Sequence, residues 1–244
     1  MKLNFKILSS YIEDFPIYFY ESTDSTNTRA ELILKERKSE NFAVVAKEQT
    51  DGKGRCGKSF FSPKDTGVYF SVVIHLDGNY SDIVGLTPMA AVAVVNSIEK
   101  YTDLKPTIKW VNDIYSGDKK ICGILVKSTG NAYIIGIGIN VTTVNFPEDL
   151  IRTAGSIGHD IDFNMLVADI IKNILSMSAE LSEKKFMDEY RKKSNVIGKQ
   201  INYYINSEQY DGLVIDIDDS GGLTVEKNGI KKVLTSGEIT VRTK

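Results

Sequence analysis

The stretch Gly52-Lys53-Gly54-Arg55-Cys56-Gly57-Lys58-Ser59 (GKGRCGKS) fits two kinds of structure that lead to different folds. As a pattern it matches G-x-x-x-x-G-K-[ST], the phosphate-binding loop of nucleotide hydrolases, which requires a strand before it and a helix after it. Residues 42–47 (FAVVAK) are typical of a strand, but residues 60–67 (FFSPKDTG) contain a proline and a glycine that break helices. A further apolar run at residues 67–76 predicts another strand. We therefore expect the loop to join two strands and the match to be accidental.

The composition of this loop still suits a negatively charged ligand. Its three glycines let the backbone approach a ligand closely, and its two lysines and one arginine supply positive charge. Composition alone leaves both an anion site and a simple tight turn open.

The totals describe an ordinary soluble chain. Its 244 residues suffice for one large domain, or for a large and a small one. A net charge of −2 and a pI near 5.8 give no general attraction to nucleic acid, so any anion site must be local. The two cysteines follow no metal-binding spacing, and no apolar run is long enough to cross a membrane. With no signal peptide at the start, we predict a cytoplasmic protein.

The first half of the chain predicts alternating strands and helices. Residues 17–21 (IYFYE) are typical of a strand, and the polar cluster at residues 22–27 (STDSTN) precedes a helical pattern that reaches Lys35. We expect a serine or threonine of this cluster to cap that helix. Thr87-Pro88 is a typical N-cap and N1 pair at the start of a helix, and the nearly apolar run up to Tyr101 predicts a deeply packed helix.

The second half predicts two more regions. Four short apolar stretches (TIKWV, DIYS, ICGILVKS and AYIIGIGINV) indicate an antiparallel meander, and residues 163–192 have helical spacing. Five short strands follow, with Asn228-Gly229 as a hairpin turn. We predict an α+β fold: a mixed, largely antiparallel sheet packed against helices in a main domain of residues 1–192. A small all-β, SH3-like barrel domain is expected at residues 195–244.

Three clusters in the meander combine polar groups with glycines. Residues 109–113 (KWVND) place a cation, an aromatic ring, an amide and a carboxylate at a turn. Residues 119–125 (KKICGIL) put lysines before a buried strand, with Gly123 where a larger side chain would block close approach. Residues 136–140 (GIGIN) end the next strand with an amide. They form no dinucleotide-binding motif, because Val141 stands where a third glycine is needed.

Together with the glycine-rich loop, these clusters resemble the biotin protein ligases. The family pattern is a GRGRRG loop, a KWPND turn, a KxxGIL strand and a GxGIN strand end, and this chain has GKGRCG, KWVND, KICGIL and GIGIN in the same order. Residues 22–27 and 48–50 also match. Lys53 replaces an arginine, which keeps the positive charge but loses the planar set of hydrogen-bond donors of a guanidinium group. Val111 replaces a proline of the turn. The resemblance covers residue 18 to the C-terminus and implies the stand-alone type, without an N-terminal helix-turn-helix domain.

What the resemblance implies is an ATP-dependent, AMP-forming ligase. Biotin and ATP would give biotinoyl-5′-AMP, and a lysine of an apo biotin carboxyl carrier domain of a carboxylase would then take the biotin. Its implied catalytic residues are Arg55 and Lys120. The implied biotin-binding residues are Ser25, Thr26, Asn27, Gln49, Gly52, Lys53, Gly54, Arg55, Trp110, Lys120 and Gly123. The implied ATP-binding residues are Arg55, Lys109, Asn112, Asp113, Lys120 and Asn140, with Asp113 facing Mg²⁺.

Several alternatives remain open at this point. The nearest is a lipoate or octanoate ligase or transferase of the same broader fold, for which Cys122 is a formal nucleophile in an apolar strand. A phosphate-binding-loop hydrolase and a non-enzymatic binding module are the other two. Arg242 is more typical of a surface cation than of a nucleotide contact. A homodimer is compatible with exposed strand edges, but the sequence leaves the oligomeric state open.

Overall fold

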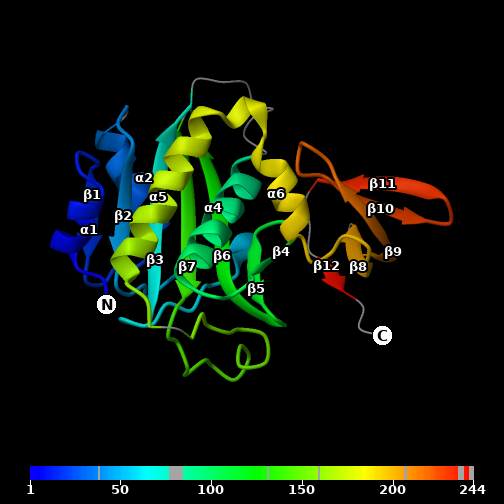
Figure 1. Ribbon diagram of the computed structural model, residues 1–244, viewed down its shortest axis with the longest axis horizontal. Coiled ribbons are helices and arrows are strands. Elements are labelled where there is room, and N and C mark those ends of the chain that lie inside the picture. Colours follow the sequence, from blue (N-terminus) through cyan, green and yellow to red (C-terminus); the bar gives the residue numbers. More distant parts are fainter. Residues whose placement is uncertain are drawn as a thin grey trace.

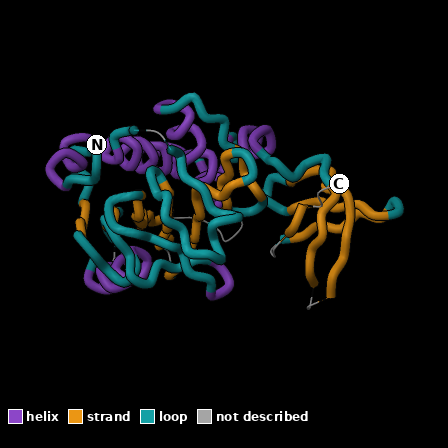
Figure 2. The backbone as a smooth tube through the Cα atoms, turned by 90° about the horizontal axis from the view of Figure 1, so that it is seen from below, coloured by secondary structure: helices purple, strands orange, loops and turns teal. Residues whose placement is uncertain are grey.

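The computed structural model describes residues 1–37, 39–76, 85–130, 132–158, 160–205, 208–235 and 239–241. Arg242 lies outside these ranges. In the described residues the chain forms a large sheet with helices on both of its sides, followed by a second, smaller sheet (Figures 1 and 2).

The large sheet has seven strands in the order β1-β2-β3-β7-β6-β5-β4. Their bounds are β1 Ile17–Tyr20, β2 Phe42–Ala46, β3 Gly67–His75, β4 Thr107–Lys109, β5 Asp113–Ser116, β6 Lys119–Thr129 and β7 Ala132–Asn140. Strands β1 and β2 are parallel, and every other neighbouring pair in the described sheet is antiparallel. The mixed, largely antiparallel sheet and the meander of β4 to β7 are therefore confirmed.

Helices cover both faces of this sheet because its strands are apolar on both faces. The helices are α1 Phe5–Tyr11, α2 Thr26–Glu36, α4 Leu86–Tyr101, α5 Phe163–Ala179 and α6 Phe186–Lys193, with 3₁₀ turns at Arg55–Gly57 and Leu181–Glu183. In β2, Ala43 and Val45 pack in the core that contains α4 and α5, whereas Phe42 and Val44 pack with α2. This alternation is the period of two expected for a strand.

Two details of the helices differ from the sequence-based expectation. Helix α4 begins at Leu86 with Gly85 as N-cap, so Thr87 and Pro88 lie two residues further inside the helix than the N-cap and N1 positions expected for them. Ser25 is the N-cap of α2, but its side chain makes no capping hydrogen bond. The oxygen of Gln49, 23 residues away, accepts from the Thr26 backbone N–H instead, at 2.8 Å. A distant side chain has taken the role that local sequence assigned to a serine.

The smaller sheet contains five antiparallel strands in the order β11-β10-β9-β8-β12. They are β8 Gln200–Ile205, β9 Glu208–Ile217, β10 Leu223–Lys227, β11 Ile230–Leu234 and β12 Ile239–Val241. Asn228 and Gly229 join β10 to β11 with φ angles of 52° and 77°, the positive values that an Asn-Gly hairpin turn requires.

The two sheets meet at the KWVND turn. The Trp110 indole N–H donates to the Gly221 carbonyl at 2.8 Å, and the Tyr190 hydroxyl donates to the Val111 carbonyl at 2.9 Å. Trp110 and Leu223 belong to one buried apolar cluster that spans both sheets. The turn between β4 and β5 is therefore held both by the C-terminal sheet, through Gly221, and by α6, through Tyr190. Among the described helices, none has the length and apolar character that a bilayer crossing demands.

Candidate active site

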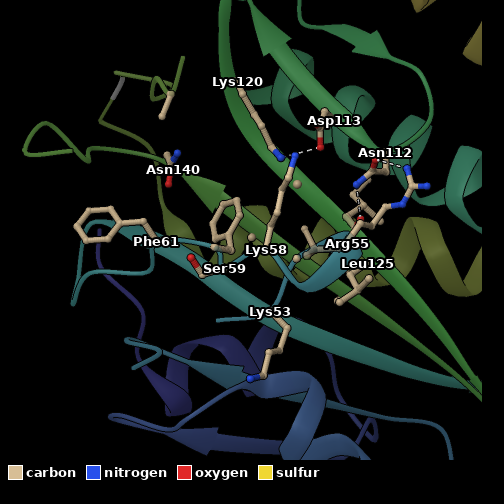
Figure 3. A pocket seen from close by; sticks show the side chains of 18 of the residues that line it. Lys53, Arg55, Lys58, Ser59, Phe61, Asn112, Asp113, Lys120, Leu125 and Asn140 are labelled. Carbon is tan, nitrogen blue, oxygen red and sulfur yellow. Dashed lines mark hydrogen bonds and ion pairs between the residues drawn. The ribbon is translucent and has the colours of Figure 1, made fainter. Parts of the chain in front are cut away.

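A cavity of about 420 Å³ opens between the glycine-rich loop and the strands β5, β6 and β7 (Figure 3). Its lining includes every residue that the sequence singled out for the site except Gly52. Gly52 is buried behind the wall, where a Cβ would lie 2.4 Å from the Phe60 carbonyl oxygen. The predicted residues, which run from Ser25 to Asn140 and are up to 115 positions apart in the sequence, thus meet around one cavity.

The glycine-rich loop connects β2 to β3, as expected, and no α-helix follows it. Its only helical part is the single 3₁₀ turn Arg55–Gly57, in which Cys56 and Gly57 have φ values of 54° and 73°. The loop folds back on itself, because the Gly54 N–H donates to the Lys58 carbonyl at 2.7 Å. The match to a phosphate-binding loop is accidental, since that motif needs a helix N-terminus to hold the phosphates.

One end of the cavity is strongly cationic. The lining has five cationic residues and a single carboxylate: Lys53, Arg55, Lys58, Lys109 and Lys120, with Asp113 as the acid. Figure 3 shows Lys58 and Lys120 directed toward the same region, whereas Lys53 points away from it. The cationic end is therefore the region around Lys58 and Lys120, and it suits a ligand with several negative charges.

Two of these cations, Lys120 and Arg55, are held by Asp113 and Asn112 of the KWVND turn. Lys120 Nζ lies 2.7 Å from Asp113 Oδ1. Arg55 donates to Asn112 Oδ1 at 3.0 Å, and the Asn112 amide donates to the Ile124 carbonyl at 2.8 Å. A register shift in the β5–β6 ladder pairs Tyr115 with Lys120. The polar part of the KWVND turn therefore serves to position Lys120 and Arg55.

The other end of the cavity is polar but uncharged. Gln49 Oε1 accepts from the Thr26 backbone and hydroxyl, at 2.8 and 3.1 Å, and Gln49 Nε2 donates to Ser62 Oγ at 2.9 Å. Asn27 lies beside Thr26, and both are buried. Hydroxyl and amide groups in a buried pocket recognise a neutral ligand through its own donors and acceptors.

Aromatic rings and glycines form the wall between these two ends. The Phe60 ring lies against Gly138 and Gly123, where a Cβ would come within 2.5 and 3.3 Å of ring atoms. A Cβ at Gly136 would lie 2.3 Å from Asn27 Oδ1. The glycines of GIGIN and KICGIL are therefore needed because other side chains occupy the space above them.

Several lining residues carried no signal in the sequence. Phe61 and Phe146 come together with ring centroids 6.3 Å apart, and Tyr204 reaches the cavity from the C-terminal sheet. They lie in segments without a motif, and only the tertiary fold brings them to the site. Asn140 was expected, and its Oδ1 is buried without a hydrogen-bond partner among the described residues, while its amide donates to the Gly155 carbonyl.

The cysteine of β6 does not take part in this site. Cys122 is fully buried, and burial raises the pKa of its thiol well above the usual range. It is absent from the cavity lining, so it meets no ligand there. Burial, with a smaller contribution from Asp113, also raises the pKa of Tyr115 to about 12, which keeps that phenol neutral. A thiol nucleophile at Cys122 therefore has no support in the structure.

Comparison with known proteins agrees with this arrangement. Residues 19–143, about half of the chain, match the Biotin/lipoate A/B protein ligase family, and the chain belongs to that family. It is 32% identical to the bifunctional ligase/repressor BirA of Salmonella typhimurium, over 90% of this chain and 72% of that protein. It is 25% identical to the biotin--[acetyl-CoA-carboxylase] ligase of Mycobacterium tuberculosis, over 89% of this chain and 85% of that one.

The fold is similar to that of solved biotin protein ligases. The structure of the Aquifex aeolicus enzyme in complex with biotin and ATP superimposes with a TM-score of 0.78 and 26% identity, covering 94% of this chain and 99% of that one.

Proposed function

We propose that this chain is a biotin protein ligase, which activates biotin with ATP and transfers it to a lysine of a carrier protein. The observation that carries the proposal is that one cavity is lined both by neutral polar side chains around Gln49 and by cations around Lys120. Biotin has groups that match both, with a neutral ureido ring at one end and a carboxylate at the other. The family membership and the similarity to the Aquifex aeolicus enzyme with biotin and ATP support this reading.

The first step requires two negatively charged groups to meet. A carboxylate oxygen of biotin attacks the α-phosphorus of ATP, a new C–O–P bond forms, and pyrophosphate leaves. Lys120 and Arg55 would neutralise the two anions and hold them in line, because a fixed cation in a partly buried site stabilises the transition state without reorganisation. Arg55 has a planar donor set that Asn112 already orients, whereas Lys120 acts as a point charge.

We propose that Asp113 faces the Mg²⁺ that enters as part of MgATP. Mg²⁺ keeps several waters and needs only one or two carboxylates beside the phosphates, so a single lining carboxylate fits. Asp113 forms an ion pair with Lys120 in this structure. MgATP would therefore have to separate this pair, so that Asp113 faces the Mg²⁺ and Lys120 faces a phosphate. No group of three or more metal-ligating side chains was found in the described part of the chain.

The other binding residues follow from their places in the cavity. Ser25, Thr26, Asn27 and Gln49 would receive the ureido ring, and the backbone of Lys53 and Gly54 would line the tail. We propose that Asn140 reads the adenine edge, since its Oδ1 is a buried acceptor without a partner among the described residues. Lys109 would contact a phosphate. Trp110 would shape the cavity wall with its ring, because its N–H already donates to the Gly221 carbonyl and is not available to a ligand.

In the second step the amine of a carrier lysine attacks the carbonyl carbon of biotinoyl-AMP. An amide bond forms, the bond to phosphate breaks, AMP leaves and the amine loses a proton. We propose that the partner is an apo biotin carboxyl carrier domain, by analogy with the biotin--[acetyl-CoA-carboxylase] ligase of Mycobacterium tuberculosis. We also propose that the chain has two domains, a catalytic domain of residues 1–192 and a small SH3-like domain of residues 195–244. A cytoplasmic location would suit the exposed free thiol of Cys56.

The direct test is incubation of the chain with biotin, MgATP and a purified apo carrier domain. We expect the carrier to gain the mass of one biotinoyl group, and to gain nothing when ATP is omitted. A lipoate ligase is the rival within the same family, so lipoate replaces biotin in a parallel reaction. Transfer of lipoate but not of biotin would overturn the proposal.

A further inference from the structure

A buried serine behind the cavity wall is not explained by the steps above. Ser71 lies in β3, is fully buried and does not line the cavity. In the sheet it is paired with Gly136 of β7, and the Asn27 carboxamide lies over that glycine. Ser71 Oγ is 2.8 Å from Thr26 Oγ1 and 2.6 Å from Asn27 Oδ1. A hydroxyl in an otherwise apolar strand costs free energy to bury unless it is hydrogen-bonded, and both of its contacts are binding-site side chains.

The number of hydroxyl protons decides how these side chains share hydrogen bonds. Ser71 and Thr26 have one hydroxyl proton each. Thr26 Oγ1 donates its proton to Gln49 Oε1, 3.1 Å away, so the single Ser71 proton is shared between Asn27 Oδ1 and Thr26 Oγ1 as acceptors. The Thr26 proton therefore stays within the protein, and Thr26 Oγ1 has only a lone pair left to offer to the cavity.

The neighbouring hydrogen bonds hold Thr26 from its other side. The Thr26 backbone N–H donates to Gln49, which fixes that oxygen as the acceptor and leaves Gln49 Nε2 to donate to Ser62. Ser62 then donates its own proton to the Phe60 carbonyl at 2.9 Å. A continuous chain of hydrogen bonds therefore runs from Ser71 in the sheet to Phe60 in the loop.

We propose that Ser71 is a positioning residue for the ureido ring of biotin, an inference that rests on the proposed function. It touches no substrate. It holds the Thr26 hydroxyl as an acceptor for a ring N–H, and it fixes the Asn27 carboxamide. The ligand class favoured by this arrangement is a neutral cyclic urea with N–H donors. The dithiolane ring of lipoate has no N–H and gains nothing from such an acceptor, so Ser71 contributes to the choice between the two acids.

The test is the steady-state kinetics of Ser71→Ala and Ser71→Cys in the full chain, with adenylate formation followed by pyrophosphate release. We expect the KM for biotin to rise about tenfold in both variants, because the loss of a buried hydrogen bond weakens the acceptor and frees the amide. The KM for ATP should stay within about twofold of its value in the unaltered chain. Alanine is smaller than serine and cysteine is larger, so an effect of the same sign in both variants reports the lost hydrogen bond rather than a change of packing.

Ser97 provides a matched control. It is as deeply buried as Ser71, donates to Asp169 at 2.9 Å and accepts from Asn173 at 3.0 Å, but it lies in α4 away from the cavity. Ser97→Ala should lower the Tm and leave the KM for biotin unchanged. If the Ser71 variants behave in the same way, or raise the KM for biotin and for ATP equally, the inference is overturned.

A double-mutant cycle with Thr26→Val gives an independent readout. If Ser71 acts through Thr26, the effects of Ser71→Ala and Thr26→Val on the KM for biotin should be clearly less than additive. Full additivity would contradict the inference while leaving the proposed function intact. Absence of any biotinoyl-AMP with the unaltered chain would instead show that the proposed function itself is wrong.

Discussion

Removal of the Lys120 charge is the most direct test of the cationic end of the cavity. In Lys120→Met the stem of the side chain is largely kept and only the ammonium is lost. Two unit charges about 4 Å apart interact by about 4 kcal/mol at the effective dielectric constant of about 20 that is typical near a protein surface. The ammonium must first leave Asp113, but the two side chains are 32% and 26% exposed. A pair of this kind contributes only about 0–1 kcal/mol.

The net loss of transition-state stabilisation is then about 3 kcal/mol, which corresponds to a roughly 100-fold lower kcat/KM. The assay is biotin-dependent exchange of labelled pyrophosphate into ATP, which reports adenylate formation without a carrier protein. Lys127→Met is the matched control, because Lys127 is on the same strand and pairs with Glu31 outside the cavity. We expect that variant to exchange within about twofold of the unaltered chain.

Both lysine variants lose one partly exposed ion pair, so their Tm values should fall by no more than about 2–4 °C. A folded Lys120→Met protein that still exchanges pyrophosphate within about threefold of the unaltered chain would refute the role given to Lys120.

Three further predictions address the rest of the site. Asp113→Asn should raise the KM for MgATP about tenfold and move the optimum of activity to a higher Mg²⁺ concentration, since a neutral amide binds the ion poorly. An unchanged dependence of activity on Mg²⁺ would mean that Asp113 only holds Lys120. Trp110→Phe removes the N–H that donates to the buried Gly221 carbonyl and should lower the free energy of unfolding by about 1–2 kcal/mol, measured by urea denaturation; unchanged unfolding would contradict this. A thiol reagent should titrate one cysteine in the native chain and two after unfolding, because Cys56 is exposed whereas Cys122 is buried and burial raises the pKa of its thiol; two fast thiols in the native state would refute this.

Sequence periodicity predicted the strands and helices well because their apolar patterns are long and regular. The apolar run of FAVVAK and the helical spacing of residues 163–192 depend only on near neighbours in the chain, and both elements are present, the former as β2 and the latter as α5 and α6. Local reasoning was wrong where a distant residue intervenes. Ser25 has the right residue type and place for a cap, but Gln49 supplies the acceptor.

The site was predictable where a motif fixes both residue type and spacing. Lys120, Asn112 and Asp113 all line the cavity, and their clusters were visible in the sequence. The contacts of Phe60 with Gly138, and of Ser71 with Asn27, join positions far apart in the chain. Nothing in a single sequence marks which phenylalanine or serine will lie above which glycine, so these residues had to come from the structure.

The bond from Trp110 to Gly221 also limits how this enzyme can be shortened. A gene fragment that stops at residue 192 would keep every side chain proposed for catalysis, yet it would leave the indole N–H without its acceptor. It would also bare the apolar surface on which the lost strands rest. A shorter biotin-labelling enzyme made from this chain must keep the small sheet, or it must replace the residues that contact the KWVND turn.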